Sequence, residues 1–327
     1  MSVRTAVAPG VFWGLQILWF PLVAVGYLLF VVKSLAYSRR SGASATVLAS
    51  FYTRWMQHQL RTRRDEPCAR LMRVLPNVSQ LGLRLVTGPT LLARRLTGYV
   101  PRIYRYPYQG KPSVRDQPAA RTTFFDRALQ RHLADVGQLV ILGAGLDTRS
   151  YRLPADTPVR CFEIDTPKTQ AFKRAMLTKA GVDATRVTFV PADFEREDWF
   201  ERLVAAGFEP HRPSFFLWES VTMYLDREAV ERTLRTIAGT APGSVVAFDY
   251  FSAQQLADRS LFMRFARVAV RAAGESFGTF GIDTTPPARQ RVAAFLASCG
   301  LSLEEQRNFG EETDRQQAVA GFATAIA

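Results

Sequence analysis

The sequence has few residues of the kinds that bind metals or cross-link a fold. Of its 327 residues only three are histidine and three are cysteine, and Cys68, Cys161 and Cys299 are scattered without a Cys-x-x-Cys pair. This spacing argues against a zinc site or a disulfide framework and favours a reducing compartment. The chain also lacks a P-loop, a nucleophile elbow, internal repeats and low-complexity segments. We therefore expect no metal cofactor, and a chain of this length needs no disulfide to stabilise its core.

Acidic residues are scarce in the first third of the chain. Up to Arg121 there are 18 Lys and Arg against three Asp and Glu, whereas the remainder has 24 basic against 26 acidic residues. This asymmetry predicts a polyanionic partner for the N-terminal part. The basic residues adjoin a hydrophobic run and lack interleaved aromatic motifs for stacking on RNA bases, so we expect an anionic membrane surface and consider nucleic acid unlikely.

Charge is absent altogether from Val11 to Val32, a run of 22 residues. A run of about 20 apolar residues can cross a bilayer as a helix. No small-residue cleavage site follows it, which argues against a secretion signal. Pro21 keeps open a kinked segment lying in the interface. Lys33 and the two arginines beyond it favour a cytoplasmic location for the rest of the chain. We thus assign residues 1–40 to a membrane anchor with a basic flank.

Residues 41–120 are expected to form a helical cap. Ser44 to Gln59 can form a helix, and Leu81 to Leu96 is a basic amphipathic segment that Gly88-Pro89 should break into two pieces. Beside a hydrophobic anchor, such a segment suggests lodging on anionic lipid. An ordinary lid helix packed on the folded domain fits it equally well.

From residue 121 to 327 the pattern alternates regularly between strands and helices, which predicts an α/β fold with a doubly wound, Rossmann-like sheet. The apolar, β-branched run Gln138 to Leu142 predicts a buried parallel strand. Two glycines follow it, Gly143 and Gly145, which let the chain turn sharply and let a ligand lie against bare backbone. We expect a helix to begin next, with its positive end facing that ligand.

The stretch from Gly143 to Arg149, followed by Tyr151-Arg152-Leu153, resembles the first nucleotide motif of the leucine carboxyl methyltransferase family. Members of this family are O-methyltransferases that use S-adenosylmethionine (SAM). The resemblance extends over roughly residues 41–327. It implies a seven-stranded sheet closed by an antiparallel pair, SAM as the cofactor, and cofactor contacts from Gly143, Ala144, Gly145 and Asp147.

Three further segments resemble family motifs that bind SAM. The family places an arginine, here Arg121, on the carboxylate of the methionine part, although a surface arginine is the alternative. An acid at the end of the second strand accepts hydrogen bonds from the ribose; we favour Asp165 and keep Glu163 as the second choice. Asp165 could instead cap the next helix. Asp193 and Phe194 resemble the pair that holds adenine.

The fourth predicted strand, Ser214 to Trp218, ends in a glutamate, a short apolar run and a tyrosine, as in the family. The resemblance puts Glu219 on the SAM side and Tyr224 near the transferred methyl group or the acceptor. Glu219 could alternatively cap the helix that begins at Asp226. Ala253 to Ala273 resembles the region that covers the substrate in the family.

These observations predict a membrane-associated, SAM-dependent O-methyltransferase with its catalytic domain on the cytoplasmic face. The acceptor would be a lipidic or isoprenoid-like small molecule with a carboxyl or hydroxyl group. A carboxylate is favoured because it needs no general base, and His58, His132 and His211 lie outside every motif. An RNA-modifying methyltransferase and a non-catalytic scaffold are the alternatives.

Overall fold

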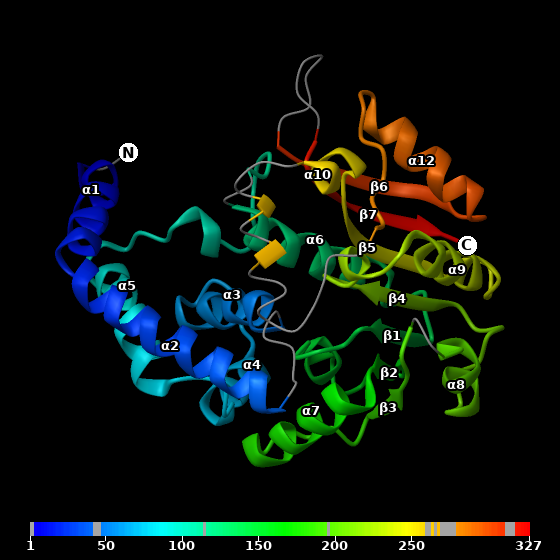
Figure 1. Cartoon of the computed structure of the whole chain (residues 1–327), viewed down its shortest axis with the longest axis horizontal. Helices are drawn as coiled ribbons and strands as arrows, with labels where there is room; N and C mark the ends of the chain where they lie inside the picture. Colours follow the sequence, from blue (N-terminus) through cyan, green and yellow to red (C-terminus); the bar gives the residue numbers. More distant parts are fainter. Residues whose placement is uncertain are drawn as a thin grey trace.

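The computed structural model describes residues 3–41, 47–113, 116–194, 197–258, 263–264, 267–268, 279–310 and 318–327. Within these residues seven strands form one sheet at the centre of the molecule (Figure 1). The spatial order is β3-β2-β1-β4-β5-β7-β6, in which β1 to β5 are parallel and β7 is antiparallel to both of its neighbours. The predicted α/β fold with a seven-stranded sheet is therefore confirmed.

The strands follow the apolar runs closely. The first five are short, and all of them except the edge strand β3 are almost wholly buried, as expected for parallel strands covered on both faces. The antiparallel pair that closes the sheet falls on the two last apolar runs, where the sequence predicts strands over Leu301 to Gln306 and Ala318 to Ala325, although the first of these strands extends to Phe309. The strands are β1 (Gln138–Leu142), β2 (Arg160–Asp165), β3 (Val187–Pro191), β4 (Ser214–Trp218), β5 (Val245–Phe251), β6 (Ser302–Phe309) and β7 (Ala320–Ile326).

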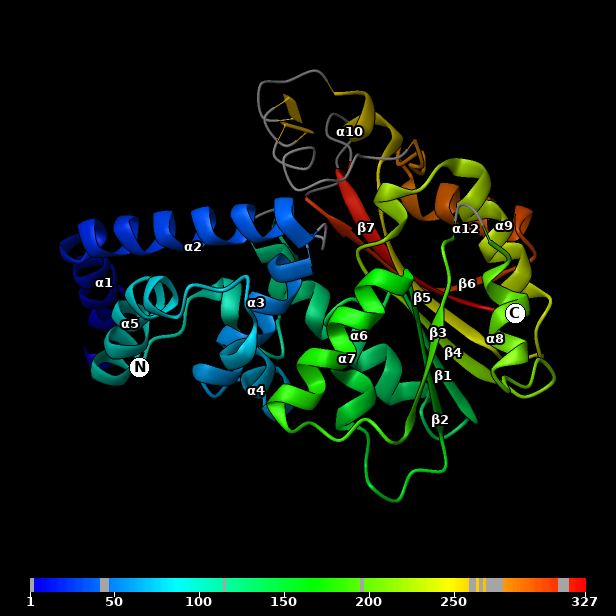
Figure 2. The same cartoon turned by 60° about the horizontal axis from the view of Figure 1, so that its bottom comes forward.

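Helices cover both faces of the sheet (Figure 2). One face packs against α8 (Trp199–Ala205), α9 (Arg227–Ala238) and α12 (Ala288–Ser298). The helices on the opposite face are α6 (Gln117–His132) and α7 (Pro167–Ala180). The cap helices α3 (Val47–Gln59) and α4 (Glu66–Val74) lie outside α6 and α7 and share a third apolar core with α7. The short α10 (Ala253–Ala257) follows β5, and most of the predicted covering segment beyond it lies outside the described residues.

The prediction that a helix begins directly after the two glycines is wrong. Gly145 is followed by a turn and then by a single short 3-10 helix, η3 (Arg149–Arg152), before β2 begins. The side chains of Asp147 and Arg149 are fixed in buried ion pairs, and these contacts hold the segment in an irregular path.

A single helix over Val11 to Val32 is also wrong, since the run forms two helices, α1 (Val3–Leu18) and α2 (Phe20–Ser41). They meet at Trp19, two residues before Pro21, where the helix turns. Among the residues that the structure describes, only Phe20–Tyr37 is long and apolar enough to cross a membrane, and 11% of that window is buried. This is weak evidence for a membrane span, because a signal sequence near the N-terminus passes the same test.

The predicted break at Gly88-Pro89 does not occur either. A single helix, α5 (Gln80–Thr97), carries Pro89 in its interior and ends at Gly98, whose φ of 73° closes it. Its neighbours α1 and α2 pack along it (Figure 2), and this packing outweighs the one backbone hydrogen bond that proline removes.

Candidate functional site

The predicted cofactor residues gather at one edge of the sheet. β1, β2, β3 and β4 run parallel, and Gly143, Asp165, Asp193 and Glu219 stand at or just beyond their carboxyl ends. The strand order reverses between β1 and β4, because the chain continues from β1 to β2 on one side and reaches β4 on the other. Ligands of open α/β sheets bind at such a reversal. The edge beyond β1 and β4 is therefore the candidate site (Figure 1).

Gly143 is required where it stands. Its φ is 65°, and a Cβ added there would lie 2.4 Å from Cγ2 of Val221, which follows β4. Any side chain would thus strain the backbone and push the two loops apart. Two residues later the backbone N–H of Gly145 donates to Oδ2 of Asp165 at 2.7 Å, so the glycine turn is tied to the end of β2.

Asp165 is half-buried, and its carboxylate accepts two backbone hydrogen bonds. Besides Gly145, the N–H of Thr166 donates to Oδ1 at 2.7 Å. Burial raises the pKa of Asp165 above its ordinary value, against the lowering effect of these two donors. The helix cap of α7 is the side chain of Thr166, so the alternative role of Asp165 as that cap is not observed.

Glu163 is fully buried beneath the same loop. Its carboxylate pairs with Nζ of Lys173 at 2.6 Å and accepts from the hydroxyl of Tyr151 at 3.0 Å. Lys173 in turn donates to the carbonyl of Asp147 at 2.9 Å. This arrangement gives Glu163 a role in supporting the loop and leaves Asp165 as the acid available to a ribose.

Arg121 lies within α6 and joins the carboxyl ends of β4 and β5. Its Nε is 3.2 Å from Oε1 of Glu219, and its Nη1 donates to Oγ of Ser220 at 2.7 Å and lies 3.8 Å from Asp249. Nη2 donates to Oγ of Ser50 on α3 at 2.6 Å. Ser220 has a φ of 62°, a strained value for a non-glycine residue that is typical of functional loops. Arg121 is therefore a buried site residue, not the surface arginine of the alternative reading.

Asp147 and Glu219 share two buried arginines. Arg149 reaches Oε2 of Glu219 at 2.6 Å and also pairs with Asp147. Arg54 of the cap helix α3 lies 2.7 Å from Asp147 and 3.6 Å from Glu219. Despite burial, these guanidinium groups lower the pKa of Glu219 and bring the pKa of Asp147 far below its usual range. Both acids are therefore anionic, and Glu219 does not cap α9, since that cap is Asp226.

A second set of buried ion pairs and hydrogen bonds joins the cap helices to the segment that follows β1. Asp126 accepts from Arg149 and from Arg63 at 2.7 Å each, and Arg63 also pairs with Asp65. The Thr148 hydroxyl donates to Asp65 at 2.9 Å. The arginines that surround Asp126 bring its pKa far below its ordinary value, against the effect of burial.

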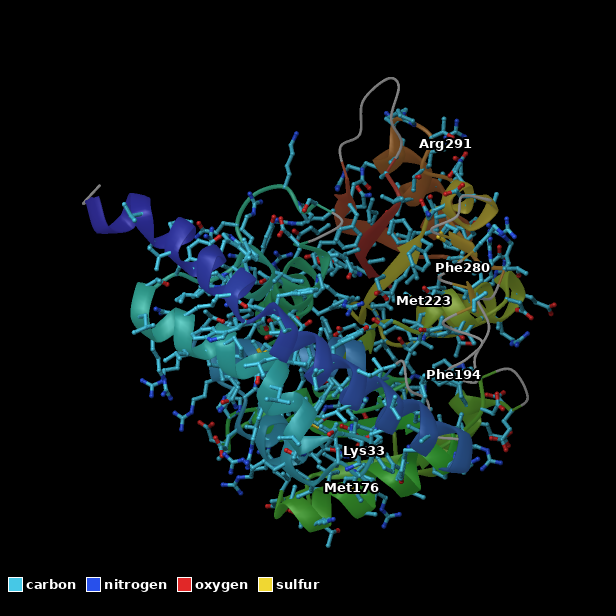
Figure 3. The ribbon with its side chains drawn as sticks, turned by 60° about the vertical axis from the view of Figure 1, so that its left-hand side comes forward. Lys33, Met176, Phe194, Met223, Phe280 and Arg291 are labelled. Atoms are coloured by element: carbon cyan, nitrogen blue, oxygen red, sulfur yellow. The ribbon has the colours of Figure 1, made fainter. Side chains whose placement is uncertain are left out.

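The residues predicted to lie on the adenine and acceptor sides are Phe194 and Tyr224, the latter in η4 (Thr222–Tyr224). Phe194 is buried beside Trp199 and Trp218, with ring centroids 6.0 and 6.5 Å away. The indole N–H of Trp218 is buried and lacks a hydrogen-bond partner. Tyr224 is half-buried in η4. Figure 3 labels Met223, which belongs to η4, and Phe280, which lies close to it. The N–H of Phe280 donates to the carbonyl of Leu225 at 3.3 Å.

Two residues in direct contact with the site went unnoticed in the sequence. Arg54 is a lone cation in the cap helix, and its contacts with Asp147 and Glu219 depend on how α3 docks. Asp249 is the one acid inside the apolar run of β5, and an acid within a buried strand is a signal that could have identified it as a candidate site residue. Its carboxylate accepts from the N–H of Ser220 at 2.6 Å.

Asp249 predicts a pH-dependent stability. It is 3% exposed, and burial raises its pKa from 3.8 to about 6 in spite of Arg121 and the Ser220 N–H. A raised pKa in the folded state means that its stabilising contribution is complete below about pH 4 and is lost as pH rises through 6. As the pH rises from 4 to 7, the free energy of unfolding of the wild type should fall by ~2 kcal/mol relative to that of the Asp249→Asn variant, which has no carboxyl group to ionise. Urea unfolding across that range measures this difference, and parallel curves for the two proteins would contradict it.

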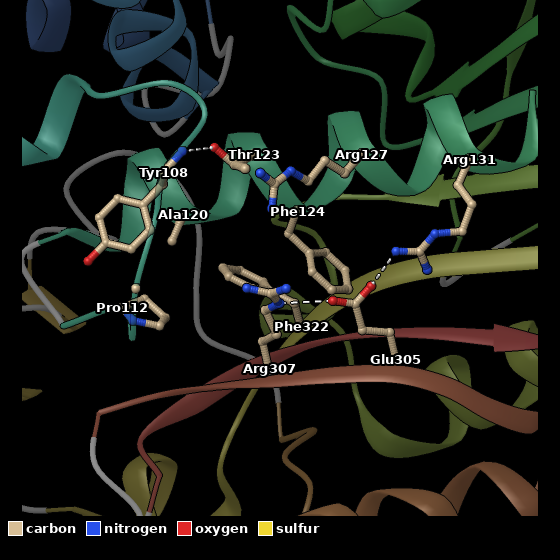
Figure 4. Close-up of a pocket in the computed structure, with 11 residues that line it drawn as sticks. Tyr108, Pro112, Ala120, Thr123, Phe124, Arg127, Arg131, Glu305, Arg307 and Phe322 are labelled. Carbon is tan, nitrogen blue, oxygen red and sulfur yellow. Dashed lines mark hydrogen bonds and ion pairs between the residues drawn. The ribbon is translucent and has the colours of Figure 1, made fainter.

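A separate cavity of about 60 Å³ lies between α6 and the β6–β7 pair (Figure 4). Glu305 bridges two of its arginines, Arg131 at 2.9 Å and Arg307 at 2.8 Å. None of the predicted cofactor residues lines it, so it is distinct from the candidate site. In the described parts of the chain no group of His, Cys, Asp or Glu could hold a metal ion, and all three cysteines are buried and free.

Comparison of this chain with known proteins identifies its family. The model for leucine carboxyl methyltransferase matches residues 101–238, which contain the glycine turn, Asp165, Asp193 and Glu219. A relative from Mycobacterium sp. (strain KMS), provisionally named a SAM-dependent methyltransferase, is 37% identical over 228 residues, which cover 66% of this chain and 70% of the relative. The chain belongs to the leucine carboxyl methyltransferase family.

Another relative matches a smaller part of the chain. A relative from Mycolicibacterium gilvum, with the same provisional name, is 38% identical over 53% of this chain and 54% of its own length. The chain thus spans little more than half of that relative. A provisionally described methyltransferase structure from Thermobifida fusca aligns with a TM-score of 0.48 at 14% identity, over 79% of this chain and 91% of that one.

Proposed function

We propose that this member of the leucine carboxyl methyltransferase family is a SAM-dependent O-methyltransferase that works at a membrane surface. Its acceptor is a lipidic or isoprenoid-like small molecule with a carboxyl or hydroxyl group. The observation that carries the proposal is the convergence of Arg121, Gly143, Asp165 and Glu219, which come from separate segments, on the strand-order reversal of the sheet.

The residues present suit SAM. Bare backbone at Gly143 to Gly145 allows a close approach, and Asp165 can accept hydrogen bonds from a ribose. The planar guanidinium of Arg121 suits a carboxylate. Phe194, whose ring centroid lies 6.5 Å from that of Trp218, is the residue that the family resemblance assigns to the adenine ring.

SAM supplies an electrophilic methyl group on a sulfonium. The tasks left to the chain are to position the acceptor in line and to exclude water. A carboxylate acceptor is already ionised near neutral pH, and Tyr224 would then serve to orient it. A hydroxyl acceptor would need a base. His58 accepts from the backbone N–H of Asp65 and His132 lies 3.1 Å from Glu304, so both contribute to structure and a carboxylate is the better choice.

Support for a membrane location comes from the N-terminal helices. α1 and α2 expose large apolar side chains, among them Ile17 at 76%, Leu18 at 70% and Phe20 at 65%. So much contiguous apolar surface is unusual for a protein that stays in solution. A cytoplasmic orientation fits the basic residues beyond Val32.

The test is methyl transfer from radiolabelled SAM to a lipid extract of the source cells. We expect label to enter an organic-soluble product, and base-labile label would identify a methyl ester and hence a carboxyl acceptor. Label in RNA, or SAM binding without any transfer, would instead favour the RNA-modifying enzyme or the scaffold.

A further inference from the structure

The apolar run that could cross a membrane is bound along its length to a charged helix. α2 and α5 cross with their backbones in contact: a Cβ on Gly26 would lie 2.9 Å from the carbonyl oxygen of Gly82, and a Cβ on Gly82 would lie 2.7 Å from that of Gly26. α1 also packs on α5, where Oγ1 of Thr90 donates to Gln16 at 3.2 Å, and Phe12 is buried against Tyr99, which follows the end of α5. Both halves of the run are thus fastened to α5.

α5 has its own apolar stripe towards solvent. Leu81, Leu92 and Leu96 are 61%, 43% and 67% exposed, and spacings of eleven and four residues place them on one side of the helix. Arg84 and Arg95, also eleven residues apart and exposed, border that stripe. A leucine stripe edged by arginines is the arrangement of a helix lying in a lipid interface.

These helices lead directly to the candidate site. Phe30 of α2 lies 6.4 Å from the ring of Tyr52 on α3, and Tyr37 lies 6.1 Å from Phe172 on α7. Figure 3 shows α2 passing over α7, with Lys33 and Met176 marked. α3 is the helix whose Ser50 and Arg54 reach Arg121 and Glu219.

We propose that α1, α2 and α5 form one monotopic docking module that lies flat in a single anionic leaflet, so that neither half of the apolar run crosses the membrane. If α2 crossed the bilayer, α5 and its arginines would have to enter the hydrocarbon with it or the Gly26–Gly82 contact would have to break. In the flat orientation the exposed side chains of α1 and α2 and the leucines of α5 enter the interface, while Arg84, Arg95 and Lys33 meet lipid phosphates. The module deepens the proposed function, because it presents α3 and the site to an acceptor held in the same leaflet.

Charge removal on α5 gives the first test. In flotation with vesicles of phosphatidylcholine and phosphatidylglycerol, Arg84→Gln/Arg95→Gln should weaken binding by roughly five-fold for each arginine. The matched control is Arg232→Gln/Arg235→Gln on α9, two equally exposed arginines that should leave binding unchanged. Equal binding of all three proteins would overturn a lipid-facing α5. A wild-type protein that associates with itself and does not float would assign the apolar face to a second copy.

Topology gives the second test. A Val7→Cys variant places a thiol on exposed α1, and the native cysteines are buried. The flat module buries this thiol in the interface on the cytoplasmic side, so a membrane-impermeant maleimide should leave it unlabelled in intact spheroplasts and should label it only after detergent dissolves the membrane. Labelling from outside the spheroplasts would show a crossing helix and overturn the proposal. SAM titration of the same preparations is an independent readout, so loss of the methyltransferase assignment would be distinguishable from loss of the docking mode.

Discussion

Replacing Asp165 by asparagine is expected to weaken SAM binding by ~10- to 100-fold. The carboxylate stands at the end of β2 beside the glycine turn, where it can accept from ribose hydroxyls. A hydrogen bond to a charged acceptor contributes about 1.5–3 kcal/mol, and the amide removes both the charge and one acceptor atom. Calorimetric titration with SAM measures the loss directly.

The control for Asp165 is Asp156→Asn, since Asp156 is an exposed acid in the loop before β2. It should bind SAM as wild type does. Because Asp165 also holds the N–H groups of Gly145 and Thr166, both variants need a urea unfolding curve at the titration temperature. Unchanged affinity in a folded Asp165→Asn protein would remove the ribose role and return Glu163 to consideration.

Asp126→Asn is expected to destabilise the fold by ~3–5 kcal/mol. Arg63 and Arg149, each 1% exposed at the side chain, both depend on this carboxylate. Removing one member of a buried ion pair leaves uncompensated charge in a medium of low dielectric. The network joins the cap helices to the loop after β1. We therefore expect the midpoint of urea unfolding to fall in a single transition, with the cap and the sheet unfolding together.

An exposed pair provides the matched comparison. Glu228→Gln removes a partner of Arg232 in an ion pair with exposures of 88% and 54%, and such pairs contribute about 0–1 kcal/mol. The double variant Arg63→Met/Asp126→Asn should lose less than the sum of its single changes, because each change removes part of the same interaction. Additive losses would show that Arg63 and Asp126 act independently.

The sheet was predictable from the sequence because its strands carry their own signals. The short apolar runs ending at Leu142 and Trp218 are bounded by glycine or acid, and parallel strands of this order bring their carboxyl ends together. The position of Asp165 and Glu219 at the same edge of the sheet could therefore be predicted. The closing pair β6–β7 follows from the last two apolar runs.

Features that depend on tertiary packing were not predictable. The run from Val11 to Val32 is apolar on every side, so its hydropathy pattern does not divide it into two helices, and only Pro21 signals a kink near Trp19. Gly88-Pro89 favours a break by local propensity, and packing along α5 overrides it. The helix expected after Gly145 is replaced by side chains in a buried charge network. That network includes Arg54 and Arg63, which lie far away in the sequence.

The measurement that bears most directly on the account is calorimetric titration of the full chain with SAM in a lipid or detergent environment. The account predicts one site with micromolar affinity, equivalent to about −8 kcal/mol, that is weakened when Arg121 is replaced by methionine. A folded protein that takes up no SAM at millimolar concentration would contradict it.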